Sequence, residues 1–258
     1  MVLFLAGLIF GSFATALSYR IPRGINWKTE RSECTKCHKK LKWYDNIPLL
    51  SYLFLWGKCR FCREKISCRY PLIEVFSGLI FVATYLAFYF SDSTLLSLFR
   101  NELGFMGLIF TLIVFFLCYL ILIIDWENKI IPDEIIVFLS TLIITTFIIL
   151  DYSNIYLHIV CAFAASFFLL SINLLTKGRG MGLGDVKLAV PIGLLLGFPY
   201  TPLWIFLSFI LGAIVAIVLL MLKKAKRKDE IPFGPFLVAA FILVFLWGNT
   251  LLRLIMPL

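Results

Sequence analysis

The chain has 258 residues, of which 61% are hydrophobic and 15% charged, and its net charge is +9. A soluble domain of this length holds about 25% charged residues, so the composition excludes an ordinary water-soluble enzyme. Apolar runs of about 17 to 25 residues, the length that crosses a bilayer core, recur along the sequence and predict an all-α, polytopic transmembrane helical bundle.

Eight apolar runs are candidate transmembrane helices. In chain order they cover about residues 1–19, 72–90, 105–124, 134–150, 156–176, 187–199, 203–222 and 235–256. The first run has no basic residue before it and is followed at once by Arg20 and Arg23, which favours an uncleaved span over a secretory signal. The sixth run is short and contains Pro191, so we expect a tilted or partial span there.

The basic residues predict the orientation of these spans. Twenty-two of the 24 Lys and Arg side chains fall in the segments 20–71, 125–133, 177–187 and 223–234. Loops rich in Lys and Arg face the cytoplasm, so these four segments are expected inside and the N-terminus outside. The same bias accounts for the net charge without nucleic-acid binding, because basic loops beside spans face anionic lipid.

Residues 20–71 form the one long polar segment and hold four of the seven cysteines. Cys34 and Cys37 form one CxxC pair, Cys59 and Cys62 a second, and 21 residues separate the pairs. This spacing is typical of a structural zinc site, where four thiolates bind one tetrahedral ion. A segment of about 50 residues buries little core, so a metal would stabilise it.

The sequence thus predicts three domains. They are a first span (1–19), a small zinc-binding cytoplasmic domain (20–71) and a membrane domain (72–258).

Other interpretations of these cysteines remain open from the sequence. CTKCH, with His38, also matches the attachment motif of c-type haem, but that attachment belongs outside the cytoplasm and leaves the second pair unexplained. Disulfides are disfavoured in a reducing cytoplasm, and a redox dithiol needs only one pair. Basic residues beside the pairs would favour thiolates. These residues are Lys36, Lys58, Arg60 and Arg63.

Two carboxylates stand out at the borders of the spans. Asp125 ends the third span in LILIIDWENKIIPDE, and Asp185 precedes the sixth span in MGLGDVK. The predicted topology brings both to the cytoplasmic membrane border. If they face each other, repulsion and partial desolvation would leave one proton shared between them, as in an aspartyl protease. The alternative is that each caps or ends a helix.

The residues around these aspartates have both chemical and structural interpretations. Gly182 and Gly184 would allow backbone conformations closed to other residues and the close approach of a substrate strand. Lys187 either tunes the ionisation of Asp185 or extends its ammonium group to the interface. Asp133, at the start of a span, is expected to cap free helix amides.

Five ordered segments resemble one family, the type IV prepilin peptidases, which are membrane aspartyl proteases of the GxGD kind. The segments are GSFATALSYRIPRG, the cysteine-bearing stretch from Cys34 to Glu74, IDWENKIIPDE, GLGDVK and IPFGPFL. The resemblance covers nearly the whole chain, and several motifs in order are more specific than any one of them.

This resemblance implies that Asp125 and Asp185 are the catalytic pair. It also implies that the substrates are type IV prepilin or pseudopilin precursors, of a pilus or a type II secretion system. A basic leader would be cleaved from them on the cytoplasmic side of a bacterial inner membrane. Many members then methylate the new N-terminal amine with S-adenosylmethionine.

If methyl transfer occurs here, the candidates are Gly57, Lys58 and Glu74 near the cysteines. Their alternative interpretations are a turn glycine, a counter-charge of the zinc site and a first-turn acid stabilised by the helix dipole.

The predicted function is therefore a membrane-border endopeptidase with the lipid bilayer as a second partner. Zinc is expected to be structural, because four cysteine ligands leave no open position for water. Two rivals remain. A proton- or cation-coupled transporter would place acids near the middle of spans, whereas a zinc-bearing adaptor would give no reason for the glycine-flanked Asp185.

Overall fold

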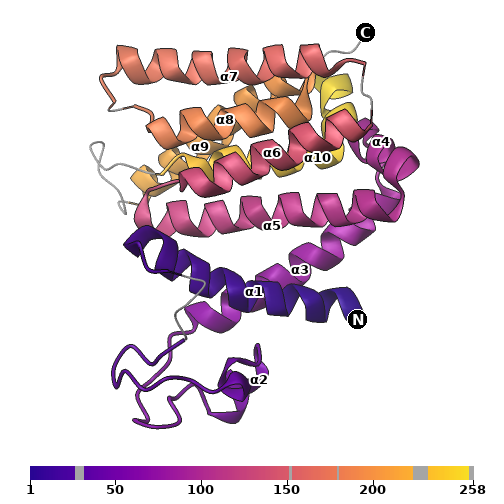
Figure 1. Cartoon of the computed structure of the whole chain (residues 1–258). Helices are drawn as coiled ribbons and strands as arrows, with labels where there is room; N and C mark the ends of the chain where they lie inside the picture. The colour runs from indigo at the N-terminus through magenta and orange to yellow at the C-terminus, as the bar shows by residue number, and fades with distance from the viewer. Residues whose placement is uncertain (27–31, 151–152, 179, 223–231, 256–258) are drawn as a thin grey trace. The chain divides into compact units, whose positions relative to one another are not determined.

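The computed structural model describes the chain except residues 27–31, 151–152, 179, 223–231 and 256–258, so the basic segment 223–231 and the first residue of IPFGPFL lie outside the described residues. The long regular elements of the described part are all helices, and the cysteine segment around α2 is mostly irregular (Figure 1). That segment also contains two isolated bridges. The helices are α1 (Val2–Arg20), α2 (Leu50–Phe54), α3 (Arg69–Phe90), α4 (Thr94–Leu103), α5 (Phe105–Asn128), α6 (Asp133–Ile149), α7 (Ile155–Leu175), α8 (Leu183–Leu196), α9 (Tyr200–Met221) and α10 (Gly234–Ile255). Two short 3₁₀ helices, η1 (Ile21–Arg23) and η2 (Trp43–Asn46), precede α2.

All eight apolar runs form helices, which confirms the all-α prediction, but the number of full spans is corrected. Within the part of the chain that the structure describes, six helices are long and apolar enough to cross a membrane: α1, α3, α5, α7, α9 and α10. The helix α6 has 17 residues and α8 only 14. At 1.5 Å per residue α8 is about 21 Å long, shorter than a bilayer core of about 30 Å. The sixth run is therefore a partial span, as expected.

Two helices were not predicted from the sequence. The helix α2 is a single turn between the two cysteine pairs, too short to give a periodic pattern. The helix α4 is amphipathic and buries Leu95, Leu96 and Phe99. Because its other face is polar, the segment does not form an apolar run and was expected to be an outer loop.

The chain folds as two compact units. The first unit contains residues 1–86 and 111–120, and glycines bring α1 and α3 into close contact within it. A Cβ atom at Gly7 would lie 2.7 Å from the Cα atom of Gly78, and one at Gly11 would lie 2.6 Å from the Cα atom of Glu74. The Arg69 guanidinium, at the start of α3, donates a hydrogen bond of 2.7 Å to the Ser18 hydroxyl of α1.

The second unit contains residues 87–110 and 121–258, and α8 is enclosed within it. Ten of the 14 residues of α8 are buried. Gly193 of α8 packs against α7, where an added Cβ atom would lie 2.9 Å from the Cα atom of Ala162. His158 is buried and lies 2.7 Å from the Leu194 carbonyl oxygen. A helix too short to span thus has a fixed position inside the bundle, and this sets the position of Asp185 at its start.

Candidate active site and cysteine cluster

Asp125 lies in the last turn of α5, with 5% of its surface exposed. Its Oδ2 atom is buried and has no hydrogen-bond partner among the described residues. Gly234, the first residue of α10, lies directly against it, since an added Cβ atom would be 2.5 Å from that oxygen. A buried carboxyl oxygen without a partner costs free energy, so this residue is unlike one retained for stability.

Asp185 is the third residue of α8 and is 6% exposed. Its Oδ2 atom accepts a hydrogen bond of 3.1 Å from the backbone N–H of Gly182, the N-cap residue. Capping therefore does describe one oxygen of this carboxyl group. The capping bond also fixes the side-chain rotamer, because it ties the carboxyl group to its own backbone.

The two carboxyl groups lie beside glycines that pack against a common side chain. One side chain, Ile131 in the link between α5 and α6, connects the helix ends around them. A Cβ atom at Gly184 would lie 3.1 Å from the Ile131 Cβ atom, and one at Gly234 would lie 3.3 Å from its Cδ1 atom. The end of α5 and the beginnings of α8 and α10 thus meet around two acidic side chains within the second unit.

The two GxGD glycines were expected to adopt unusual backbone conformations and to leave space beside the backbone. The structure corrects the first of these expectations. Gly182 has φ of −77°, and Gly184 is the second residue of α8, so neither needs a conformation closed to other residues. Their need for space is real, because an added Cβ atom would lie 3.3 Å from Asp185 Oδ2 at Gly182 and 3.1 Å from Ile131 at Gly184. Glycine is required here by close packing.

A polar residue of α7 holds the loop that leads to Asp185. The buried Asn173 side chain donates a hydrogen bond of 2.6 Å from Nδ2 to the Met181 carbonyl oxygen. That carbonyl belongs to the same peptide group as the Gly182 N–H that binds Asp185. Sequence reasoning missed Asn173 and Gly234. An asparagine inside the apolar run SINLL was the available signal for the first, and the segment IPFGPFL for the second.

Lys187 and Asp133 form an ion pair that the sequence did not predict. The Lys187 Nζ atom lies 2.8 Å from Oδ1 and 2.9 Å from Oδ2 of Asp133. Both side chains are more than half exposed. The N-cap of α6 is Pro132 without a side-chain cap bond, so the expectation that Asp133 caps this helix is wrong. The pair joins the beginnings of α6 and α8 beside the carboxyl groups.

The four cysteines of the two CxxC pairs come together within the first unit. Their Sγ atoms all lie within 4.8 Å of one another, and those of Cys34 and Cys62 are 3.8 Å apart. A tetrahedral zinc ion with Zn–S bonds of about 2.3 Å requires sulfur atoms about 3.8 Å apart. The cluster therefore fits a zinc ion.

The two CxxC pairs, which we call the first and the second knuckle, have the same backbone hydrogen bonds. In the first pair the Cys34 N–H donates to the Lys39 carbonyl oxygen, and the His38 N–H donates to the Cys34 carbonyl oxygen. In the second pair the Cys59 N–H donates to the Glu64 carbonyl oxygen, and the Arg63 N–H donates to the Cys59 carbonyl oxygen. The backbone N–H of Cys37 lowers the pKa of the Cys34 thiol to about 7. At Cys34 this favours the thiolate, which is the form that binds metal.

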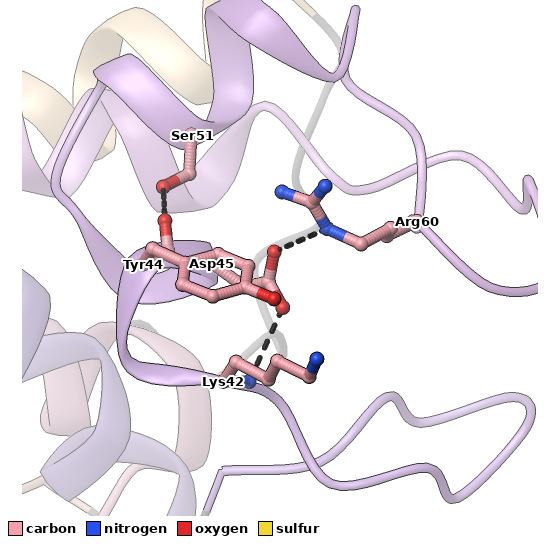
Figure 2. A network of polar contacts seen from close by, with 5 residues as sticks. All are labelled: Lys42, Tyr44, Asp45, Ser51 and Arg60. Atoms are coloured by element: carbon pink, nitrogen blue, oxygen red, sulfur yellow. Dashed lines mark hydrogen bonds and ion pairs between the residues drawn. The ribbon is translucent and has the colours of Figure 1, made fainter.

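A buried carboxylate fixes the second knuckle to the rest of the segment (Figure 2). Asp45 of η2 accepts a bond of 2.7 Å from Arg60 Nε and one of 3.2 Å from the Lys42 backbone N–H. The Asp45 side chain is only 2% exposed. Ser51 of α2 donates to the Tyr44 carbonyl oxygen at 2.7 Å. Arg60, expected to offset the charge of the thiolates, pairs with Asp45 instead.

The three candidates for methyl transfer lie near the two ends of α2. Gly57 has φ of +64° and accepts the Ile66 N–H, so it is a turn glycine. Lys58 follows it and is exposed. Glu74 is the sixth residue of α3, buried, and accepts a bond of 2.8 Å from the Leu49 N–H. The interpretation of Glu74 as a first-turn acid is therefore wrong.

These features define a class: a polytopic helical membrane protein with paired buried acids at the ends of its helices and a separate four-cysteine cluster. The comparisons with known proteins make this specific. The chain belongs to the type IV leader peptidase family. The description "Type IV leader peptidase family" matches residues 112–217, and "Bacterial Peptidase A24 N-terminal domain" matches residues 5–88.

Several bacterial relatives are similar over almost their whole length, and each is named prepilin leader peptidase/N-methyltransferase. The relative from Pseudomonas aeruginosa is 31% identical, over 96% of this chain and 90% of its own. The relative from Bacillus subtilis is 30% identical, over 97% of this chain and 95% of the relative's length. The relative from Vibrio cholerae is 32% identical, over 95% of this chain and 96% of the relative's length. No solved structure matches the chain.

Proposed function

We propose that this protein is a multi-pass inner-membrane aspartyl endopeptidase that removes the basic leader from type IV prepilin or pseudopilin precursors and then methylates the new N-terminus. One observation carries the peptidase assignment: two acids 60 residues apart in the sequence are both buried, and the helix ends around them pack against one side chain, Ile131. The names of the relatives give the substrate class. Neither a transporter nor an adaptor is favoured by a comparable observation.

The reaction follows from the shared proton. The ionised carboxylate takes a proton from water, the oxygen of that water attacks the scissile carbonyl, and the protonated carboxyl group gives its proton to the carbonyl oxygen. As the C–N bond of the resulting diol breaks, the leaving amine takes a proton from the first aspartic acid, and a diol hydroxyl returns its proton to the second carboxylate. No side chain forms a covalent bond to the substrate.

The names of the relatives support the second activity, methyl transfer. Zinc bound by Cys34, Cys37, Cys59 and Cys62 would stabilise the segment 20–71 and take no part in hydrolysis, because no coordination position stays open. S-adenosylmethionine, when bound, supplies the methyl group. The Glu74 carboxylate suits its cationic sulfonium, and the exposed Lys58 suits its carboxylate. With the basic segments facing the cytoplasm, both activities lie on that side.

Substitution of each aspartate tests the peptidase assignment. Asp125→Asn and Asp185→Asn should each lower the rate of precursor cleavage in detergent by about 10³-fold or more, because an amide neither takes nor gives the required proton. Asp133→Asn is the matched control: an exposed acid near the same helix ends that should keep cleavage within a few-fold.

Cleavage by either catalytic variant at the wild-type rate contradicts the assignment. Mass spectrometry of a co-expressed precursor reports the cut position and any added methyl group together.

A further inference from the structure

The helix α2 has two faces of opposite character. Ser51 and Tyr52 face the cysteine segment, where Ser51 bonds to the Tyr44 carbonyl and the Tyr52 ring lies against Gly57. Leu50, Leu53 and Phe54 lie at i, i+3 and i+4, so they share the other face. They are 51%, 65% and 80% exposed, and Trp56 just beyond the helix is 88% exposed. These four residues form what we call the α2 apolar face.

The ends of α2 are held in uncommon backbone conformations. Leu49 before the helix has φ of +58° and Trp56 after it has φ of +54°. Large side chains rarely adopt positive φ, and such strain persists only where the surroundings compensate for it. An apolar face left in water offers no such compensation.

A contact with α3 fixes the level of α2 relative to the bilayer. The Leu49 N–H binds Glu74, five residues beyond the start of α3, which is about 8 Å along the helix axis. The span Arg69–Phe90 has 22 residues, about 33 Å, which barely exceeds a hydrocarbon core of about 30 Å. A span centred on that core places Glu74 about 6 Å inside the hydrocarbon boundary, so the start of α2, which is bonded to it, lies level with the outer part of the hydrocarbon. At this level α3 exposes Leu72 and Phe76, at 54% and 55%.

We propose that the α2 apolar face inserts into the lipid bilayer, so that the cysteine segment rests on the membrane as a monotopic element between its two spans. Trp56 is then at the headgroup level, where tryptophan is enriched. For the α2 apolar face to be in water or covered by protein, α2 would have to lie away from the bilayer. The hydrogen bond between Leu49 and Glu74 opposes this position. The proposal is independent of the peptidase assignment.

Quenching of tryptophan fluorescence tests this placement. The full chain is reconstituted in vesicles of phosphatidylethanolamine and phosphatidylglycerol that contain a phosphatidylcholine brominated on its acyl chains. Subtracting the emission of Trp56→Phe from that of the wild type isolates Trp56 from the other five tryptophans. We expect bromine close to the headgroup to reduce this difference signal at least about twofold, and aqueous iodide to leave it nearly unchanged.

Two variants separate the face from the rest of the segment. Leu53→Ser with Phe54→Ser should make Trp56 accessible to iodide and lower its quenching by brominated lipid at least about twofold. Phe61→Ser, which alters an aromatic residue of the second knuckle, should change neither. Quenching by iodide in the wild type overturns the proposal, because the face is then in water. Protection from both quenchers also overturns it, because the face is then covered by protein.

Discussion

Asp125 and Asp185 are held by different local means. Asp185 begins a helix and is oriented by its own N-cap peptide, whereas Asp125 ends a helix and keeps a buried oxygen with no partner among the described residues. Different surroundings are what two identical acids need to perform different halves of an acid–base reaction. The sequence identified both acids from their position at the ends of apolar runs. It did not reveal the groups that orient them, because these come from α7 and α10.

Asn173→Leu tests whether the loop before Asp185 is held by its peptide. Without the bond to the Met181 carbonyl, the Gly182 N–H loses its fixed direction toward Asp185. We expect kcat to fall about 10- to 100-fold with KM within about twofold, because misplacement of a reacting group acts on the transition state. Steady-state kinetics with a purified precursor measures both.

The matched control is Ser166→Ala, which removes another hydrogen bond from α7, the one to the Val186 carbonyl at 3.0 Å. It should lower kcat by no more than a few-fold. An equal loss in both variants would show that Asn173 acts only through general packing of α7 on α8.

Gly234→Ala tests the space beside Asp125. The added methyl group would lie 2.5 Å from Asp125 Oδ2, so either the carboxyl group or the start of α10 must move. We expect cleavage to fall by about 10²-fold while the purified protein stays helical by circular dichroism. Gly212→Ala is the control, since its nearest neighbour is a Phe233 ring atom at 3.2 Å. Full activity of Gly234→Ala would mean that the site does not depend on this contact.

The cysteine knuckles show what an element adds beyond its residues. The CxxC spacing predicted four ligands, and the structure brings those four sulfur atoms together. The spacing could not show that each knuckle closes with the same pair of backbone bonds, since both bonds of each pair involve a residue outside the CxxC motif. Nor could it show that Arg60 turns away to a buried Asp45.

Removal of one thiol tests the metal. The purified wild-type chain should contain about one zinc ion, and Cys34→Ser should lose it, because three sulfur ligands bind zinc much more weakly. Cys68→Ser should keep the ion, since the Cys68 Sγ atom contacts the Tyr52 hydroxyl group. Elemental analysis measures both. A normally folded wild type without metal would contradict the structural role of zinc.

For the molecule as a whole, hydropathy predicted every long helix, because a bilayer demands unbroken apolar segments. It overestimated the number of full spans. The helix α8 is apolar for a different reason, because ten of its 14 residues are buried inside the second unit. The helix α6, with 17 residues, exposes apolar side chains such as Phe138 and Ile148 and is short rather than enclosed. The division into a first span, a cysteine domain and a membrane domain stays a prediction. The structure has two units instead, and α5 contributes residues to both. The paired acids belong to the second unit and the cysteines to the first.

This division leads to a test that separates the two activities. Lys58 lies in the first unit beside the turn glycine Gly57, with its ammonium group exposed. If it binds the carboxylate of S-adenosylmethionine, Lys58→Ala should lower the methylated fraction of the mature pilin at least about 10-fold, the usual effect of losing one charged contact. The cleavage rate should stay within about twofold, because the acids of the second unit are unchanged.

The matched control is Lys65→Ala, which changes the exposed residue that pairs with Lys58 in an isolated bridge. This variant should affect neither product. The intact mass of pilin from cells that express each variant distinguishes precursor, cleaved and methylated forms. Equal loss of methylation in both variants would assign the effect to the charge of the segment, and loss of cleavage in Lys58→Ala alone would show that the two activities share this residue.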